Sequence, residues 1–306
     1  MENVRESARK IKIGTPLRFD EPLAGHTSFR IGGPADAYAL PKTPAEIGEL
    51  LSFCRSRHVP FFLLGGGTNI LVSDAGVRGM VIDLSALCGI STDDRELSAE
   101  CGSPMDKACA FALSRGLRGL EFASGLPGSV GGAVWMNARC YEKSLSDFLV
   151  RTEVLDADGV VRAVPTVPSQ WGYKRSPFQQ RGGVILRAFF RLEHGDQGLI
   201  LEEMKKHMAD RTAKGHFLHP SAGSVFKNNR DFGAPTGKLI DSLGLKGKRI
   251  GDAAIAPFHG NIIVNLGNAT ARDVLSLIRL VEEEVGSKLG FELEREIILV
   301  GEWTTP

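Results

Sequence analysis

Apolar side chains recur at helical spacing in several parts of the chain. The clearest case is residues 270–289, where one face repeats at i, i+3, i+4, i+7 and i+11: Val274, Leu277, Ile278, Val281 and Val285. A helix is also predicted for residues 199–211. The pattern therefore predicts two helices in the last third of the chain.

Two further helices are predicted nearer the amino terminus, each with residues that start or stop it. Thr43 can cap a helix that has Pro44 at its first position and Glu46 in place for a capping box. Its apolar face follows at helical spacing: Ile47, Leu50, Leu51 and Cys54. The other helix starts at residues 103–104 and ends at Gly116. Its apolar face consists of Met105, Cys109, Ala112 and Leu113.

Short apolar runs bounded by turn residues predict strands. Residues 59–64 and 80–84 are such runs, so the first ~85 residues have the length and pattern of a small βαβ-type unit. Residues 148–164 predict a hairpin around Asp158-Gly159, which is typical of a two-residue turn. Further strands are predicted at residues 184–192, 223–226, 262–265 and 297–300.

This mixture of elements predicts an α+β protein of more than one domain. No internal repeat, low-complexity tract or long linker interrupts the pattern. Changes in the pattern predict domains at residues 1–85, 86–194 and 195–306, with limits good to several residues and with the last residues able to return to the first domain.

The composition is that of a folded soluble protein without a strong electrostatic field. Of the 306 residues, 42% are hydrophobic and 24% charged. The 37 Lys and Arg residues balance 36 Asp and Glu residues, which argues against a nucleic-acid or membrane-surface partner. A charged ligand must therefore be bound by locally placed groups.

Targeting features and cysteine usage indicate a cytoplasmic protein. The longest apolar runs are far too short to cross a bilayer. The amino-terminal stretch MENVRESARKIKIG has no apolar core of a secretory signal. The five cysteines form no C-x-x-C pair and are expected to be reduced thiols: Cys54, Cys88, Cys101, Cys109 and Cys140.

Glycines are the most distinctive part of the composition, with 36 in the chain, and two clusters follow predicted elements. Gly65-Gly66-Gly67-Thr68-Asn69 comes directly after a predicted buried strand. Successive residues without Cβ let backbone N–H groups close around an anion. The cluster matches neither the P-loop nor the G-x-G-x-x-G pattern, and a plain tight turn is the alternative.

The second cluster, GLPGSVGGA at residues 125–133, carries no charged side chain. Such a loop suits close approach to a diphosphate or to a flat ring, and a purely structural loop is again the alternative. Two such loops in one chain favour a nucleotide or dinucleotide site.

Seven motifs together make the chain similar to a known family. They are TSFRIGG (27–33), LGGGTNIL (64–71), GLPGSVGGAVWMNA (125–138), YKRSPF (173–178), SAGSVFKN (221–228), LIDSLGLKGKRIG (239–251) and LEREIILVG (293–301). In this order they resemble the UDP-N-acetylenolpyruvoylglucosamine reductases, a family of FAD enzymes, over residues ~27–301. The resemblance implies a two-part FAD-binding region of the vanillyl-alcohol-oxidase type and a carboxy-terminal α+β substrate domain.

The resemblance also implies which residues bind FAD. They lie in both glycine loops, with Arg30 as a further contact for which an exposed arginine is the alternative: Gly65, Gly66, Gly67, Thr68, Asn69, Ile70, Gly125, Pro127, Gly128, Ser129, Gly131, Gly132, Ala133 and Asn137. No His stands beside the first loop, so the FAD is expected to be non-covalent.

The family's reaction implies two catalytic residues. NADPH reduces FAD, hydride then passes to C3 of the enolpyruvyl ether of UDP-N-acetylglucosamine, and C2 is protonated to give UDP-N-acetylmuramate for peptidoglycan. Ser224 matches the family's proton donor, although by itself it would be taken for a serine that satisfies a turn. Glu296 matches the acidic residue that assists charge stabilisation. Glu294 lies on the same face of a strand, and only the family register selects Glu296.

The motif Tyr173-Lys174-Arg175-Ser176 departs from the family's usual Tyr-Arg-x-Ser, in which the Arg binds substrate. Lys174 takes the place of that Arg and keeps its charge without the bidentate fork. Alternatively, Arg175 turns inward. In an extended segment neighbours face opposite sides, so only one of the two would serve.

Further polar residues are implied to meet the UDP-sugar: Lys227, Asn228, Arg211 and Lys214. A helix carboxy terminus favours basic residues anyway, which is the alternative for Arg211 and Lys214. His259 is read as ordinary polar packing. Arg139 stands where the family usually has Gly, and the spacing from Tyr173 to Ser224 resembles the shorter family form that lacks an inserted substrate-covering loop.

Two other functions remain open. One is another FAD oxidoreductase of the same fold, which would have no reason to carry SAGSVFKN or LEREIILVG. The other is a non-catalytic nucleotide-binding protein with a degenerate site. Its only support is that Lys174 stands where the family usually has Arg. A metal site is not expected, because no His, Asp or Glu cluster has ligand spacing. NADPH and the UDP-sugar are the expected small-molecule partners, and no protein partner is implied.

Overall fold

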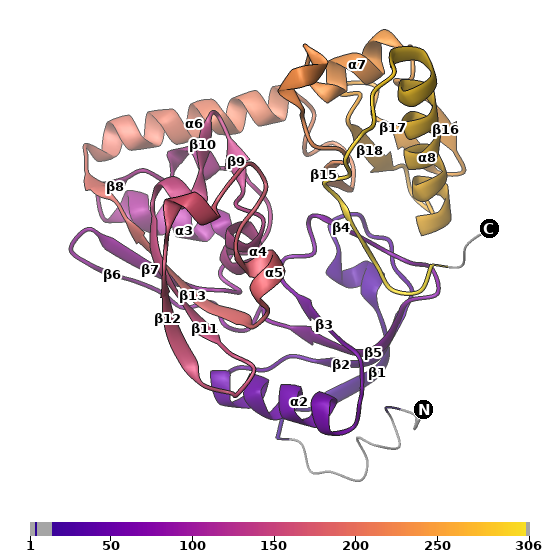
Figure 1. Ribbon diagram of the computed structural model, residues 1–306. Coiled ribbons are helices and arrows are strands. Elements are labelled where there is room, and N and C mark those ends of the chain that lie inside the picture. Colours follow the sequence, from indigo (N-terminus) through magenta and orange to yellow (C-terminus); the bar gives the residue numbers. More distant parts are fainter. Residues whose placement is uncertain (1–3, 5–13, 304–306) are drawn as a thin grey trace. The chain divides into compact units, whose positions relative to one another are not determined.

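The computed structural model describes Val4 and residues 14–303 (Figure 1). The predicted absence of a secretory signal concerns residues that lie almost wholly outside this part. The chain forms two compact units, each built from separate stretches of sequence. Of the described residues, the first contains Val4 and residues 14–18, 37–66 and 79–210, and the second contains residues 19–36, 67–78 and 211–303. The three predicted domains remain a prediction.

The first unit contains a five-stranded antiparallel sheet whose strands run side by side in Figure 1. Its order is β12 (Val161–Pro165), β11 (Leu149–Leu155), β13 (Val184–Arg191), β7 (Glu96–Glu100) and β6 (Ile90–Asp93). Two smaller pairs are β8 (Leu117–Arg118) with β14 (Glu193–His194) and β9 (Arg139–Cys140) with β10 (Lys143–Ser144).

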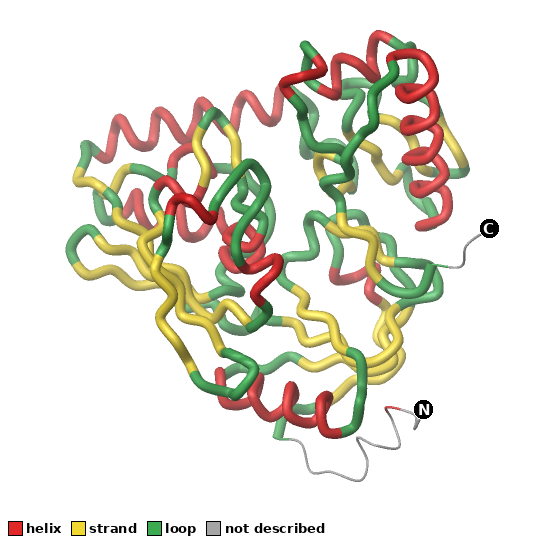
Figure 2. Tube along the Cα trace, in the orientation of Figure 1, coloured by secondary structure: helices red, strands yellow, loops and turns green. Residues whose placement is uncertain are grey.

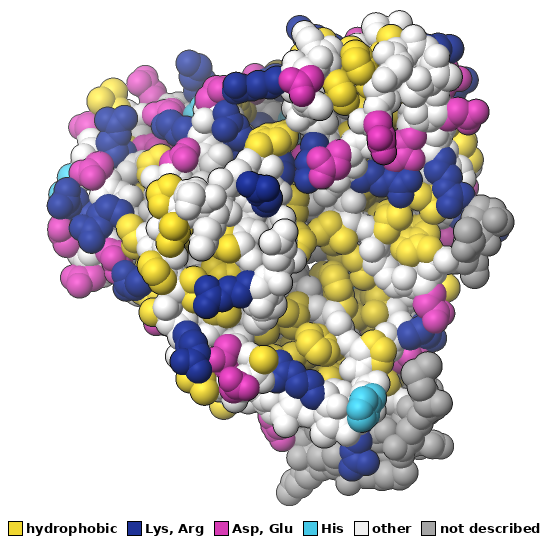
Figure 3. All heavy atoms as spheres, viewed as in Figure 1, with side chains coloured by type: hydrophobic (Ala, Val, Ile, Leu, Met, Phe, Trp, Pro, Cys, Tyr) yellow, Lys and Arg dark blue, Asp and Glu magenta, His cyan; other side chains and the backbone are white. Residues whose placement is uncertain are grey.

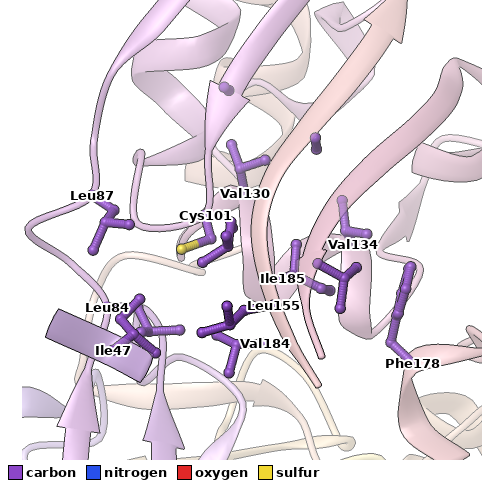
Figure 4. Packing of buried hydrophobic residues seen from close by; sticks show 14 of the residues in the cluster. Ile47, Leu84, Leu87, Cys101, Val130, Val134, Leu155, Phe178, Val184 and Ile185 are labelled. Carbon is purple, nitrogen blue, oxygen red and sulfur yellow. The ribbon is translucent and has the colours of Figure 1, made fainter. Parts of the chain in front are cut away.

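The helices of the first unit include one, α2, that begins at residues of the expected kinds. They are α2 (Pro44–Ser56), α3 (Met105–Ser114), α4 (Val130–Trp135), α5 (Phe178–Arg181) and α6 (Gln197–Ala213), the last of which extends into the second unit. At α2 the Thr43 side chain accepts a hydrogen bond from the Glu46 N–H, and Pro44 opens the helix. Ile47 of α2 packs near Leu84, Leu155 and Val184 in the core of the unit (Figure 4).

A four-stranded sheet has the order β1 (Leu17–Pro22), β2 (Pro34–Ala39), β5 (Val77–Asp83) and β3 (Phe61–Leu64). β3 and β5 are parallel. The boundary between the two units falls within β1, β2 and β5, so these strands contribute residues to both. Short 3-10 helices complete the chain at η1 (Leu23–His26), η2 (Glu121–Ala123), η3 (Leu145–Asp147), η4 (Pro168–Gln170) and η5 (Arg230–Phe232).

The second unit combines the end of the chain with two early segments. Its sheet has the order β15 (Ser221–Ser224), β18 (Ile262–Asn265), β17 (Ala253–Ile255) and β16 (Arg249–Ile250), and β19 (Ile298–Val300) pairs in parallel with β4 (Ile70–Val72). The helices are α7 (Thr236–Ser242) and α8 (Ala271–Leu289). The core includes side chains from early in the sequence, namely Phe29, Ile31 and Leu71.

Helix α8 is held at its amino terminus by two carboxylates. Thr270 and Asp273 form the capping box. Asp74, nearly two hundred residues earlier, accepts hydrogen bonds from the N–H groups of Ala271 and Arg272 at 2.8 and 3.0 Å. A negative charge at this end of the helix also stabilises the helix dipole. The cap therefore ties the early segment to the carboxy-terminal part of the second unit.

Most of the predicted elements are confirmed, as the helices and strands coloured in Figure 2 show. The helices α2, α3, α6 and α8 and the strand β18 lie where the pattern places them. The hairpin of β11 and β12 is present, but its loop of residues 156–160 is longer than the predicted two-residue turn. The Asp156 carboxylate accepts hydrogen bonds from the N–H groups of Asp158 and Val160, which explains the wider loop.

The sequence pattern missed three short helices, α4, α5 and α7. Helix α4 begins inside the second glycine cluster, and α7 carries no strong periodic signal because it is brief. Strand β3 starts at Phe61 rather than at residue 59. Element limits are where local propensity is least decisive.

The described part of the chain contains no helix both long and apolar enough to span a membrane. All five cysteines lie within that part, and none of them forms a disulfide there. Burial raises the pKa of Cys101 and of Cys109 to about 12, and that of Cys54 to about 11. The protonated form of these three thiols is therefore favoured, and they act as core residues.

Candidate functional site

Within the first unit, Gly65 and Gly66 of the first glycine loop lie against the second glycine loop. Gly66 N–H donates a hydrogen bond of 3.2 Å to the Ser129 hydroxyl, which also accepts one of 3.3 Å from Gly132 N–H. A Cβ on Gly66 would lie 2.6 Å from Gly128 Cα, and one on Gly65 would lie 2.7 Å from Ser129 Oγ. Both contacts are shorter than side chains tolerate, so backbone approach requires glycine here.

The second loop is anchored on the turn that leads into α3. Gly131 N–H donates to the Cys101 carbonyl oxygen at 2.8 Å, and a Cβ on Gly131 would lie 2.7 Å from Cys101 Cβ. Met105 N–H donates to the Gly128 carbonyl oxygen at 3.0 Å. The loops thus form a closely packed region of backbone and small side chains, without a charged group in residues 125–133. Such a region fits the diphosphate and ring of a dinucleotide.

Asn137 connects this region to the Tyr173 motif. The residue is buried and adopts a positive φ of 44°. Its side-chain N–H donates to the Gly172 carbonyl oxygen at 2.9 Å, and its side-chain oxygen accepts from Ser146 N–H at 3.1 Å. The buried Ser176 hydroxyl donates to the Trp135 carbonyl oxygen at 2.6 Å. The side chain predicted to contact FAD is therefore engaged in holding the neighbouring loop.

Tyr173 and Lys174 are the central residues of a tight turn. Gly172 and Arg175 exchange two backbone hydrogen bonds of 3.0 and 3.1 Å, and Lys174 has a φ of 54°. Tyr173 and Arg175 are exposed, whereas Lys174 is half-buried. The segment is not extended, so the alternation of neighbouring side chains on which the sequence argument relied does not apply.

The structure brings the segments of Ser224 and Glu296 together in the second unit. Glu296 N–H donates to the carbonyl oxygen of Val225 at 2.8 Å. Lys227 N–H donates to the Glu294 carbonyl oxygen at 2.8 Å, so the two segments run alongside each other. Glu296 is buried and Glu294 is exposed. This difference in burial distinguishes the two carboxylates that the alternating pattern left equivalent.

Asn69 bonds the same segment. Its side-chain N–H donates to the Glu296 carbonyl oxygen at 3.0 Å, and its carbonyl oxygen accepts from Ile298 N–H at 3.0 Å. The residue follows the first glycine loop in sequence. The family resemblance predicts an FAD contact for Asn69, and its observed contacts in this unit are to the Glu296 segment.

Asn261 is a site residue that the sequence analysis missed. Its side chain pairs with both polar groups of Phe226: the N–H donates to the Phe226 carbonyl oxygen at 2.7 Å, and the oxygen accepts from Phe226 N–H at 2.9 Å. Val225 N–H donates to the Asn261 carbonyl oxygen at 2.9 Å. A buried Asn two residues after His259 is a weak signal in sequence, because an amide that replaces a strand partner has no periodic pattern.

Lys227 and Asn228 have partners within the unit. The Lys227 ammonium lies 2.5 Å from a Glu294 carboxylate oxygen. The Asn228 side-chain oxygen accepts from Thr236 N–H at 2.9 Å, at the start of α7, and the Thr236 hydroxyl donates to the Lys227 carbonyl oxygen at 2.8 Å. A ligand that binds Lys227 must therefore compete with an exposed ion pair, which is a weak interaction.

The TSFRIGG motif folds onto the strand that carries Ser224. The Ser28 hydroxyl donates to the Ser221 carbonyl oxygen at 2.7 Å, and Ser28 N–H donates to the Gly67 carbonyl oxygen at 3.0 Å. Phe29 is buried in the core of the unit. Arg30 is exposed with a φ of 56°, so its side chain is available to a ligand.

The side chains of Arg211 and His259 are both partly buried and make few polar contacts. The Arg211 guanidinium lies 5.9 Å from the centre of the Phe217 ring, and its Nε is buried without a hydrogen-bond acceptor among the described residues. His259 Nδ1 accepts from Asn261 N–H at 3.2 Å. Burial, together with the charges of Lys214 and Lys246, lowers the pKa of His259 below its ordinary value. These contacts agree with a packing role for His259.

The distribution of charged and potential metal-ligand side chains is as follows. Basic and acidic side chains are interspersed over the face in Figure 3. Within Val4 and residues 14–303, no group of three or more His, Cys, Asp or Glu side chains could hold a metal ion.

Comparisons with known proteins match both parts of the chain. Residues 35–164 match the model of an FAD binding domain, and residues 215–300 match that of the UDP-N-acetylenolpyruvoylglucosamine reductase C-terminal domain. The reductase of that name from Treponema denticola is 45% identical over 304 residues, covering 94% of each chain. The one from Caldanaerobacter subterraneus subsp. tengcongensis is 41% identical over 286 residues, again covering 94% of each.

A solved structure shows the same fold. The crystal structure of the UDP-N-acetylenolpyruvylglucosamine reductase from Thermus caldophilus is similar with a TM-score of 0.78 and 35% sequence identity. The match covers 94% of this chain and 98% of that chain. The expected combination of an FAD-binding region with a carboxy-terminal α+β domain is thereby confirmed.

Proposed function

The chain belongs to the UDP-N-acetylenolpyruvoylglucosamine reductase family, and from this premise we propose that it reduces UDP-N-acetylglucosamine enolpyruvate to UDP-N-acetylmuramate. NADPH is the reductant, FAD is the cofactor, and the product serves peptidoglycan precursor synthesis. The observation that carries the proposal is the hydrogen bond from Glu296 N–H to the Val225 carbonyl oxygen, which brings the segments of Ser224 and Glu296 together.

The two glycine loops would hold FAD. Gly65, Gly66 and residues 125–133 have the bare backbone that the close approach of a diphosphate requires, and Gly67 and Thr68 continue the first loop. FAD supplies hydride transfer from NADPH to C3 of the enolpyruvyl ether. Residues 65–69 contain neither His nor Cys, which supports non-covalent binding.

Ser224 would donate the proton to C2. Addition of hydride at C3 leaves an electron pair at C2 that is delocalised onto the adjacent carboxylate. Transfer of the Ser224 hydroxyl proton to C2 forms the C–H bond of the lactyl ether. A serine hydroxyl is a weak acid, so neighbouring groups must stabilise the oxygen that remains. Glu296, on the adjoining segment, assists this charge stabilisation near the enolpyruvyl group.

A cation must stabilise the enolpyruvyl carboxylate as its negative charge increases. We assign this role to the Tyr173 turn, and to Lys174 in preference to Arg175 because Lys174 takes the place of the family's usual Arg and is half-buried. Lys227 and Asn228 would contact the UDP-sugar, with Arg211 and Lys214 adding positive charge for the diphosphate. Arg30 is exposed and would be a further FAD contact.

The test uses the purified protein. Its visible absorbance spectrum reports bound FAD, and NADPH oxidation is followed with and without UDP-N-acetylglucosamine enolpyruvate. We expect a yellow protein that oxidises NADPH rapidly only when this substrate is present, with UDP-N-acetylmuramate as product. A yellow protein that ignores the substrate would favour a different FAD oxidoreductase, and failure to reduce any substrate would favour the degenerate nucleotide-binding protein.

A further inference from the structure

Glu296 lies outside the regular strand ladder, so its backbone needs other support. Strand β19 begins two residues later, at Ile298. The N–H of Glu296 is bonded to Val225, which leaves its carbonyl oxygen to be satisfied from elsewhere. The side-chain N–H of Asn69 donates to this oxygen at 3.0 Å. The Asn69 side chain thus completes the backbone hydrogen bonding of Glu296.

Asn69 also bonds the segment two residues further on, at Ile298. Its own carbonyl oxygen accepts from Ile298 N–H at 3.0 Å, so the side chain and main chain of Asn69 bracket Ile297. Ile297 is buried in the core of the second unit. With the buried residue and both bracketing bonds in place, the backbone at Glu296 has little freedom to rotate.

We infer that Asn69 is a positioning residue for Glu296 and acts by fixing the Glu296 carbonyl group. This inference rests on the catalytic role proposed for Glu296, and it changes the role of Asn69 from the FAD contact expected from sequence to a support for Glu296.

The chemistry of the side chain makes the role specific. A carbonyl oxygen needs a donor, and the Asn amide provides one, whereas Asp has the same shape but only acceptors when ionised. Asn69→Ala removes the donor, and Asn69→Asp replaces it with a group that repels the Glu296 carbonyl oxygen. Misplacement of a catalytic group by about 1 Å can reduce the rate by about 100-fold. We therefore expect kcat to fall by about 10- to 100-fold in both variants.

The experiment compares these variants with the unchanged protein, all with FAD bound. FAD content is measured from the visible spectrum, and kcat and KM are measured for NADPH and for the UDP-sugar. We expect the FAD content and the KM for NADPH to stay as in the unchanged protein. Asn268→Ala is the matched control, since this exposed asparagine of the same unit bonds Asp252 with its backbone N–H and its side chain, and among the described residues it has no contact to the Glu296 segment.

A double-mutant cycle tests whether Asn69 acts through Glu296. Once Glu296→Gln has removed the carboxylate, adding Asn69→Ala should lower kcat by less than about twofold, because the two changes affect one function. Losses that multiply would show that Asn69 acts independently, and loss of FAD in Asn69→Ala would return it to the cofactor site. Either result overturns the inference.

Hydrogen exchange separates failure of the inference from failure of the proposed function. In Asn69→Ala, a peptide covering residues 293–299 should exchange its amide hydrogens faster than in the unchanged protein. Unchanged exchange refutes positioning by Asn69 whatever the kinetics. Full activity of Glu296→Gln contradicts the proposed role of Glu296 instead, and exchange then decides whether Asn69 holds the segment.

Discussion

The N–H of Glu296 donates a hydrogen bond of 2.8 Å to the carbonyl oxygen of Val225, the residue directly after Ser224. Asn261 holds the opposite side of the same segment through the peptide groups of Val225 and Phe226. The backbone that carries Ser224 is thus fixed from two sides, while the Ser224 hydroxyl has no hydrogen-bond partner among the described residues. A hydroxyl free of structural bonds is available for proton donation.

Ser224→Ala should abolish most of the substrate reduction without unfolding the protein. Loss of a general acid reduces the rate by about 100- to 10,000-fold. FAD content and thermal stability should not change, because no structural hydrogen bond is lost. Steady-state NADPH oxidation with the UDP-sugar measures the effect. Ser287→Ala, on α8 of the same unit, is the control, and a rate within about tenfold of the unchanged protein would contradict the role of Ser224.

Gly66→Ala should reduce FAD binding and lower the melting temperature. The new Cβ would lie 2.6 Å from Gly128 Cα and 2.8 Å from Ser129 N. Both neighbours are backbone atoms, so the two loops must separate. We expect a loss of about 1–3 kcal/mol in the free energy of unfolding and a lower content of FAD.

Gly48→Ala is the matched control for Gly66→Ala. Gly48 lies within α2 and a Cβ there would meet no atom within 4 Å. The substitution should stabilise the helix by about 0.5–1 kcal/mol. Equal effects of the two substitutions, measured by thermal and denaturant unfolding, would argue against close loop contact as the reason for Gly66.

Lys174→Ala and Arg175→Ala should have unequal effects. Lys174 is half-buried in the turn, and Arg175 is exposed. Loss of the cation that binds the substrate carboxylate should lower kcat/KM for the UDP-sugar by about 100-fold, corresponding to about 3 kcal/mol of transition-state stabilisation. Arg175→Ala should lower kcat/KM for the UDP-sugar by less than about threefold. The reverse order would assign the role to Arg175.

Stability should fall in acid partly because of His259. Its pKa in the folded protein lies below its ordinary value of 6.5, with burial as the main cause and Lys214 and Lys246 adding to it. The unfolded chain therefore binds more protons than the folded protein as the pH falls below 6.5. The contribution of neutral His259 to the free energy of unfolding is fully present above pH 6.5, and it is lost as the pH drops through the lowered pKa.

His259→Asn tests this dependence. The Asn side chain retains an acceptor for Asn261 N–H but does not titrate. Denaturant unfolding measured over the acid range should show a smaller slope of stability against pH in the variant. An unchanged slope would exclude His259 as a contributor.

Periodic features of the chain were predictable from sequence. Helix α8 has a long apolar face and a capping box, and α2 has a cap and Pro at its first position, so local rules suffice to place both helices. The seven motifs likewise suffice to indicate the family, because each is a contiguous run of residues. Burial, by contrast, separates Glu296 from Glu294 only in the folded chain.

Long-range hydrogen bonding was decided by tertiary structure. The partners Asn69 and Glu296, or Asn261 and Phe226, are far apart in sequence and follow no repeat, so no local pattern predicts them. The glycines of the first loop were identified from sequence, yet their contact with Gly128 and Ser129 depends on how two distant loops pack. Sequence alone thus determined the elements, the family and the chemical groups. The fold determined which backbone groups hold them in place, since an unsatisfied buried polar group must find its partner wherever the chain brings one.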